Sequence, residues 1–106
     1  MTDDELDLIF KALGDPTRRR ILDLLRERPE RSLFEVCASS FAADGKSLSR
    51  QTISQHLDML ERAGLITTAW KGRTKTHSLN VAPMRAATDL WLRKHLQERH
   101  PPCGSM

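Results

Sequence analysis

The chain has 106 residues, of which 39% are hydrophobic and 29% charged, and its formal net charge is +3. This length suits a single domain with one modest core, and the composition is that of a soluble globular protein rather than a disordered one. The longest apolar runs are too short to span a bilayer, the amino terminus is acidic where a secretion signal would be basic, and the two cysteines lie far apart, so we expect no membrane contact and a cytoplasmic, reduced setting.

The positive charge is unevenly distributed along the chain. Residues 1–10 carry four acids and no Lys or Arg, which leaves 17 basic against 10 acidic side chains in the rest. Between Lys46 and Lys75 there are six basic and two acidic residues. The basic segment therefore predicts an anionic partner such as a nucleic acid.

Two helices are expected in the first 28 residues. The first covers residues 3–13, ends at Gly14 and carries an apolar stripe of Leu6, Ile9, Phe10 and Leu13. Asp15 then provides an N-cap and Pro16 a first helical residue, which predicts a second helix to about Arg28 that buries Ile21, Leu24 and Leu25. Arg18, Arg19 and Arg20 point in three directions on this helix, so at least one is expected to be structural and to pair with Asp15 or Asp23.

A third helix is predicted from Leu33 to about Ala42. Ser32 and Glu35 have the spacing of a capping box, in which each side chain binds the backbone N–H of the other residue. The following loop, residues 43–48, is longer than the turn of three or four residues that is typical of a helix-turn-helix.

The helix that begins at Ser49 has one apolar and one polar face. Ile53, Leu57, Leu60 and Ala63 form the apolar stripe, and Gly64 ends the helix. Short hydroxyl and amide side chains of the kind that read base edges dominate the other face. Base contacts are expected from Gln51, Ser54, Gln55 and His56, and phosphate contacts from Arg50 and Thr52 in the first helical turn. Asp58 is a poor neighbour for phosphate and is expected to turn away or to pair with Arg62.

A basic β-hairpin follows directly. Residues 65–70 and 74–81 are rich in Thr, Ile, Val and Trp, and they are joined by a turn at residues 71–73 in which Gly72 can adopt a positive φ. Lys71, Arg73 and Lys75 make its tip cationic, which favours phosphate contact. A polar-faced helix beside a basic hairpin predicts a winged helix-turn-helix that binds double-stranded DNA.

A last helix is expected from Pro83 to about Arg99, with Met84, Ala87, Leu90 and Trp91 on one side. The predicted fold is therefore mainly α with a small β-hairpin: about five helices and a two-stranded wing. We expect one domain over residues 1–100 and a disordered tail over residues 101–106.

Several blocks of this sequence occur together in one known family. Phe10-Lys-Ala-Leu-Gly-Asp-Pro-Thr-Arg-Arg-Arg-Ile-Leu22, Thr52-Ile-Ser-Gln-His-Leu57, Leu60 to Ile66 and Gly72-Arg73 resemble the ArsR/SmtB repressors of bacteria. The closing segment Asn80 to Leu92 looks most like the SdpR-type subgroup, whose members lack an obvious metal box. The resemblance covers roughly residues 6–92.

The resemblance implies a homodimeric winged helix-turn-helix repressor that occupies an operator, which we expect to be pseudo-palindromic. In such proteins the first and last helices pair across a two-fold axis, which would here use Leu6, Ile9, Phe10, Leu13, Leu90 and Trp91. The helix after Ser49 would enter the major groove, and the wing would contact flanking DNA. The longer loop at residues 43–48 and the absence of the paired cysteines of arsenic and cadmium sensors depart from the family pattern.

Other functions leave weaker signals. Ser54, His56 and Asp58 cannot form a catalytic triad, since residues two apart do not face each other on a helix, and we expect no enzyme activity, cofactor or metal site. His95, His100, Cys37 and Cys103 are ligand-capable, so a metal- or thiol-responsive repressor remains an alternative, with its effector unknown. A protein-interaction module without DNA binding is a further alternative.

Overall fold

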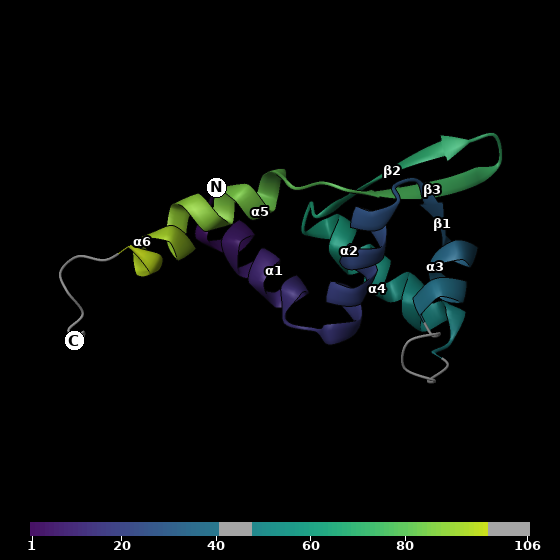
Figure 1. Ribbon diagram of the computed structural model, residues 1–106, viewed down its shortest axis with the longest axis horizontal. Coiled ribbons are helices and arrows are strands. Elements are labelled where there is room, and N and C mark those ends of the chain that lie inside the picture. The colour runs from purple at the N-terminus through teal and green to yellow at the C-terminus, as the bar shows by residue number, and fades with distance from the viewer. Residues whose placement is uncertain (41–47, 98–106) are drawn as a thin grey trace.

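The computed structural model describes residues 1–40 and 48–97. Helices dominate this part of the chain, and one small antiparallel sheet lies at the end opposite α1 and α6 (Figure 1). The predicted fold class, mainly helical with a β-hairpin wing, is confirmed. Within the described residues, no helix combines the length and the apolar character needed to cross a membrane.

The first two helices begin at well-formed caps. The helix α1 (Asp3–Leu13) starts at a capping box in which Thr2 and Glu5 bind each other's backbone N–H, at 2.7 and 3.1 Å. The helix α2 (Pro16–Glu27) starts at Asp15, whose carboxylate accepts from the N–H groups of Thr17 and Arg18, at 2.8 and 3.1 Å. The Asp15 cap was predicted, whereas the Thr2 capping box was missed.

The buried face of α2 differs slightly from the prediction. Ile21 and Leu25 are buried as expected, but the third buried residue is Leu22, and Leu24 is only half-buried. The reason is that α2 contacts α1, α3, α4 and β3, so its apolar surface is wider than the single stripe assumed from the sequence.

A short strand, β1 (Arg31–Ser32), was not predicted. It pairs with β3, Arg31 opposite His77 and Ser32 opposite Thr76, so the sheet has three strands in the order β1-β3-β2 instead of two. A strand of two residues has no alternation for a sequence pattern to reveal. The helix α3 (Leu33–Ser40) follows at once, with the predicted capping box of Ser32 and Glu35 at 2.9 and 3.2 Å.

The predicted end of this third helix at Ala42 and most of the loop at 43–48 fall outside the described residues. The helix α4 (Arg50–Arg62) then leads through Gly64, at φ 77°, into β2 (Ile66–Lys71). The hairpin turns at Gly72, at φ 62°, into β3 (Thr74–Leu79). The strand β3 ends two residues before the predicted Val81. The reason is that the side chain of Asn80 binds the backbone on both sides: its NH2 group donates to the Gly64 carbonyl (2.9 Å), and its oxygen accepts from the Ala82 N–H (3.3 Å).

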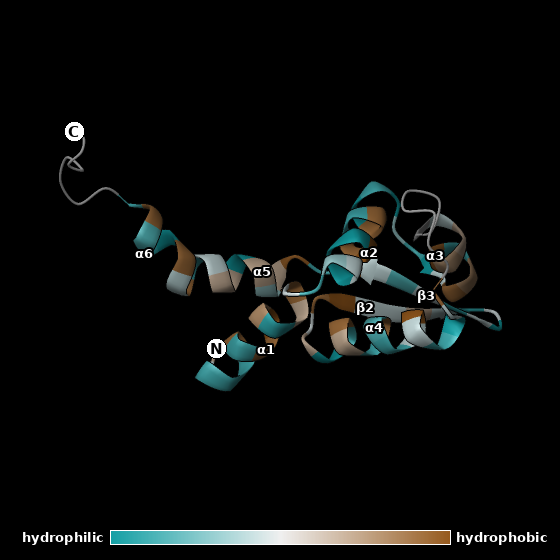
Figure 2. Cartoon of the chain, turned by 90° about the horizontal axis from the view of Figure 1, so that it is seen from below, coloured by the Kyte–Doolittle hydropathy of each residue, from teal (hydrophilic) through white to brown (hydrophobic). Residues whose placement is uncertain are grey.

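The last helix changes its winding along its length. Its α-helical start α5 (Ala82–Ala87) continues as a π-helical turn η1 (Thr88–Leu92) and then as α6 (Arg93–Leu96). It ends at Leu96 rather than near Arg99, since Gln97 is extended. This helix runs beside α1 and projects beyond the rest of the molecule (Figures 1 and 2). The tail predicted for residues 101–106 lies outside the described part.

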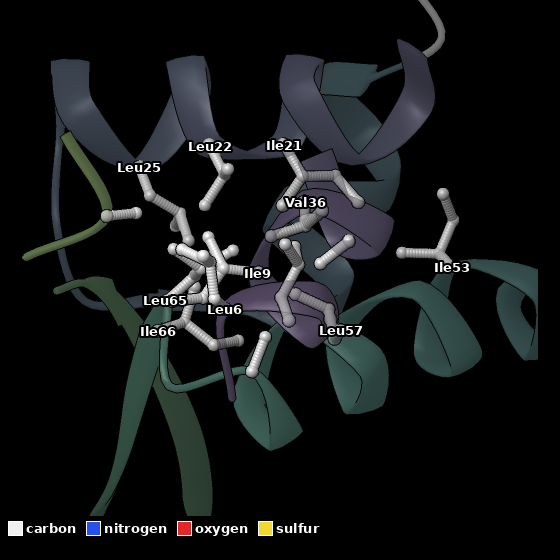
Figure 3. Close-up of a cluster of buried hydrophobic side chains, with 14 residues drawn as sticks. Leu6, Ile9, Ile21, Leu22, Leu25, Val36, Ile53, Leu57, Leu65 and Ile66 are labelled. Atoms are coloured by element: carbon white, nitrogen blue, oxygen red, sulfur yellow. The ribbon is translucent and has the colours of Figure 1, made fainter. Parts of the chain in front are cut away.

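One hydrophobic core joins these elements. Side chains from α1, α2, α3, α4 and the start of β2 converge between the helices (Figure 3). Its fully buried members include Ile9, Ile21, Leu25, Val36, Ile53, Leu60 and Leu65. The polar residues of α4 lie on the side turned away from this core (Figure 2). The core therefore fixes which face of α4 is available to a partner.

Candidate nucleic-acid interface

The helix α4 is fixed at its start and along one face. The Ser49 hydroxyl accepts from the Thr52 N–H at 3.0 Å, and the two hydroxyls lie 2.8 Å apart. Along the inner face Ile53, Leu57 and Leu60 are buried as predicted. A helix held in this way presents its polar face as a rigid surface, which is what recognition of base edges requires.

The predicted polar residues of α4 are not equally available. Arg50, Gln51 and Gln55 are exposed, whereas Thr52, Ser54 and His56 are half-buried. The Thr52 hydroxyl is already engaged in the cap. Asp58 is exposed, and no ion pair joins it to Arg62 in the described structure, so the predicted i,i+4 pair is not formed. The two glutamines are one helical turn apart and therefore lie on the same face.

His56 is oriented by an arginine from α2. Its Nδ1 lies 3.2 Å from Nη1 of Arg18. Because a guanidinium can only donate, Nδ1 of His56 must be the acceptor, which places the ring hydrogen of the neutral histidine on Nε2. Arg18 thereby sets His56 to offer a donor on its other edge. The same cluster contains Asp15: partial burial acts to raise its pKa, but the N–H groups of Arg18 and Thr17 and the Arg18 charge outweigh this effect and lower it.

Arg18 and Arg19 connect α2 to the end of α1. Arg18 donates from Nε to the Ala12 carbonyl at 2.7 Å and from Nη2 to the Lys11 carbonyl at 3.1 Å. Arg19 donates to the Leu13 carbonyl at 2.7 Å. The prediction that at least one is structural holds, but these two bind the free carbonyls at the end of α1, where cations are favoured, and not the side chains of Asp15 or Asp23.

Two of the three cationic side chains of the wing lie close to acidic side chains, which the sequence did not indicate. Lys71 pairs with Glu30, and Lys75 lies 4.0 Å from Glu61, so two of the three predicted cations face an acid. Arg73 is exposed and has no ion-pair partner among residues 1–40 and 48–97. The acids were missed because they are distant in sequence; only folding brings them to the hairpin. Arg73 is therefore the wing residue that is most ready to bind phosphate.

The residues predicted to face a second subunit divide into two groups. Leu6 and Ile9 are buried in the core of the single chain, at 9% and 2% exposed, and they lie too deep to form most of a contact surface. Phe10 and Leu13 are half-buried, whereas Leu90 and Trp91 are 51% and 42% exposed. The Phe10 and Trp91 rings meet edge to face at 5.9 Å, which ties the projecting last helix to α1.

The ligand-capable residues are scattered. In the described part of the chain, no group of three or more His, Cys, Asp and Glu side chains could hold a metal ion. Burial raises the pKa of the Cys37 thiol, an effect that the nearby Arg50 charge only partly offsets. The His95 ring lies against Trp91 in a tilted arrangement, with 4.3 Å between ring centroids. His100 and Cys103 lie outside the described residues.

The comparisons with known proteins decide which family this arrangement represents. Residues 13–69 match the family described as "Helix-turn-helix domain". A regulator of Bacillus subtilis, "Uncharacterized HTH-type transcriptional regulator YuzN", is 43% identical over 86 residues, which cover 81% of this chain and 94% of that protein. The chain belongs to the ArsR/SmtB-type helix-turn-helix regulators. The family resemblance drawn from the sequence is thereby confirmed.

One further relative and one solved structure also resemble this ArsR-type chain. The "Transcriptional repressor SdpR" of Bacillus subtilis is 36% identical over 77 residues, covering 73% of this chain and 78% of that protein. The crystal structure of an ArsR family transcriptional regulator superposes with a TM-score of 0.72 at 29% identity, covering 91% of each chain. The winged helix-turn-helix arrangement of α3, α4 and the β2–β3 hairpin is thus shared with solved members of the family.

Proposed function

We propose that this regulator is a homodimeric repressor that binds a pseudo-palindromic operator in double-stranded DNA, with α4 in the major groove. The observation that carries the proposal is the outer face of α4, where Gln51 and Gln55 are exposed and make no hydrogen bond within the described structure. Each carboxamide has an NH2 group that can donate to N7 of adenine and an oxygen that can accept from its N6 amino group. On a helix face that only contacts solvent, two neighbouring amides without hydrogen-bond partners would have no role.

The cations around α4 supply contacts to the DNA backbone. Arg50 stands in the first helical turn, where unpaired N–H groups also favour an anion. Arg73 stands at the wing tip, and Lys71 and Lys75 join it once they exchange Glu30 and Glu61 for phosphate. Such contacts set register and affinity, and the glutamines, with Ser54 and the Nε2 edge of His56, set sequence preference.

A dimer supports this mode of binding. The projecting last helix exposes Leu90 and Trp91 beside Phe10, which is an apolar surface that a second copy would cover. Two copies related by a two-fold axis would place their α4 helices in successive major grooves, roughly 34–36 Å apart. Repression is also the activity printed in the names of two relatives, SdpR and the "Arsenical resistance operon repressor" of Staphylococcus xylosus. The proposal includes no catalytic step and places the protein with the DNA in the cytoplasm.

The proposal is tested by fluorescence-anisotropy titration of DNA from upstream of the protein's own gene, against scrambled DNA of equal length, over a salt series. We expect an affinity on the order of 10⁻⁸ to 10⁻⁹ M for the operator and steep salt dependence. Gln51→Ala/Gln55→Ala should remove most of the preference for the operator, because each lost bidentate pair costs about 1–3 kcal/mol. Gln97→Ala makes the same chemical change far from α4 and should bind as the wild type does.

Two results would overturn the proposal. Equal, weak binding of both DNAs, followed by failure to enrich any sequence from a random DNA library, would leave a protein-interaction module. Operator binding that the double glutamine variant retains in full would mean that α4 does not read the bases.

A further inference from the structure

A groove with an unusual mixture of side chains lies between α3, α4 and the wing. It has a volume of about 480 Å³, which is within the range of small-molecule sites. Phe34 from the start of α3 and Trp70 from β2 both line it, and they are 72% and 69% exposed. Two large aromatic side chains left in water at one concave site are costly unless something covers them.

The groove also has positive charge on both sides of these rings. Arg50 lines it from α4, and Arg73 and Lys75 line it from the wing, against a single acid, Asp58. Of the wing cations at this groove, Arg73 has no ion-pair partner among the described residues, and Lys75 has only a long contact of 4.0 Å with Glu61. A guanidinium beside aromatic faces suits a planar anion, which can bind the fork of the arginine and stack on the rings.

The third feature is a buried histidine. His77 lines the same groove and is only 6% exposed. Its Nδ1 lies 3.0 Å from the Arg31 carbonyl, and since a carbonyl only accepts, Nδ1 carries the hydrogen. The Nε2 atom of the neutral ring is then an acceptor, and it has no hydrogen-bond partner within residues 1–40 and 48–97. A buried acceptor without a partner calls for a ligand that brings a donor.

We propose that this groove binds a small aromatic carboxylate that carries a hydroxyl group. The ring would pack against Phe34 and Trp70, the carboxylate would bind Arg73 with Arg50 or Lys75, and the hydroxyl would donate to Nε2 of His77. A DNA strand fits these groups less well, since a phosphodiester has no hydrogen to donate to Nε2 of His77. The site uses cations that the proposed function assigns to DNA, so ligand and operator would compete.

The experiment uses para-hydroxybenzoate as the probe and proton–nitrogen NMR correlation spectra of the full chain. The two indole N–H signals, of Trp70 and Trp91, are assigned from the Trp91→Phe variant. We expect a saturable shift of the Trp70 signal alone, with a dissociation constant on the order of 1 mM or tighter, as ligand-efficiency limits allow for so small a ligand. Because this measurement contains no DNA, its outcome does not depend on the proposed function.

Matched ligands and variants test each contact. Benzoate lacks the hydroxyl, para-hydroxybenzamide lacks the charge, and cyclohexanecarboxylate lacks the aromatic ring; each should bind at least about 5-fold more weakly, the factor expected for one lost interaction of roughly 1 kcal/mol. Arg73→Gln and Phe34→Ala change exposed residues and should weaken binding similarly without unfolding the protein. Addition of para-hydroxybenzoate to the operator complex should lower the anisotropy.

The proposal fails if no saturable Trp70 shift occurs up to about 10 mM, a tenfold excess over the expected constant. It also fails if the Trp91 signal shifts equally, or if benzoate, cyclohexanecarboxylate or para-hydroxybenzamide binds as well as the probe. A Trp70 shift with operator DNA but not with the aromatic acid would assign the groove to a DNA strand instead.

Discussion

Removing Arg18 should destabilise the fold far more than removing its neighbour Arg19. Arg18 makes three hydrogen bonds from one guanidinium: to the Ala12 and Lys11 carbonyls at 2.7 and 3.1 Å, and to His56 at 3.2 Å. It thus joins the end of α1 and the start of α2 to α4. Arg19 makes a single exposed bond, to the Leu13 carbonyl.

The magnitude follows from the number and setting of these bonds. A hydrogen bond from a charged donor contributes about 1.5–3 kcal/mol, and less where water can replace the partner. With Arg18 only half-buried, we expect Arg18→Ala to cost about 3 kcal/mol in total and Arg19→Ala about 1 kcal/mol or less. For a domain of this size, 3 kcal/mol corresponds to a fall in Tm of roughly 12–24 °C. Arg18→Lys keeps the charge but loses the planar guanidinium that makes several hydrogen bonds at once, so its cost in stability should lie between those of the two alanine variants.

The assay is urea and thermal denaturation followed by circular dichroism, at one fixed protein concentration because the stability of a dimer depends on it. Arg19→Ala is the matched control, since it removes the same side chain one residue away. Equal destabilisation by the two alanine variants would refute the role of Arg18 as the residue that joins the helices.

Three further predictions concern charge and assembly. Hydrogen bonds from the Ser32 N–H and the Arg28 side chain lower the pKa of Glu35 to about 2. Its contribution to stability is therefore fully present above its unfolded pKa of about 4.3 and is lost as the pH falls toward 2, and Glu35→Gln should flatten the dependence of the urea midpoint on pH in that window. Glu30→Gln should free Lys71, so DNA affinity should rise at low salt and the salt slope should steepen by roughly one unit per subunit. Trp91→Ala should weaken self-association in sedimentation experiments, because it removes an exposed aromatic side chain and its contact with Phe10.

Each of these has a control. Glu27→Gln also neutralises an exposed acid and should leave the acid limb of the stability curve unchanged; a Glu35→Gln curve parallel to the wild type would contradict the assignment. A Lys71→Gln/Glu30→Gln double variant should lose the gain of Glu30→Gln, and retention of that gain would mean that the acid acts elsewhere. Trp70→Ala removes the other tryptophan and should leave self-association intact, so equal weakening by both variants would count against the last helix as the dimer surface.

The helices were predictable because their signals are local. The Asp15 cap, the Ser32 and Glu35 capping box and the left-handed residue Gly64 each depend on residues within one helical turn. The apolar stripe of α4 was also predicted correctly, because the residues that recur at helical spacing are the ones that are buried.

Features that depend on contacts across the fold were not predictable in this way. The strand β1 exists only because β3 lies beside it, and Glu30, at φ 61°, makes the bend that leads into it. The π-helical turn in the last helix carries no composition signal. The acids opposite Lys71 and Lys75 come from outside the hairpin, so the hairpin sequence alone could not show that these two lysines are paired.

The candidate site was predictable in its location but not in its internal order. The sequence placed Gln51 and Gln55 on the outer face of α4, where they are exposed. It could not show that His56 is bound by Arg18, because the two residues are 38 positions apart. The groove of Phe34, Trp70 and His77 was equally hidden, since its lining residues come from helices and strands that are far apart in the sequence.

Ser32 belongs to two elements at once, and this has a mechanical consequence. It pairs with Thr76 in the sheet, and its side chain caps α3. The hairpin and α3, the first helix of the helix-turn-helix, are therefore connected through the same residue. A tilt of α3 would move the hairpin as well, and the contacts of the wing with DNA would change with it.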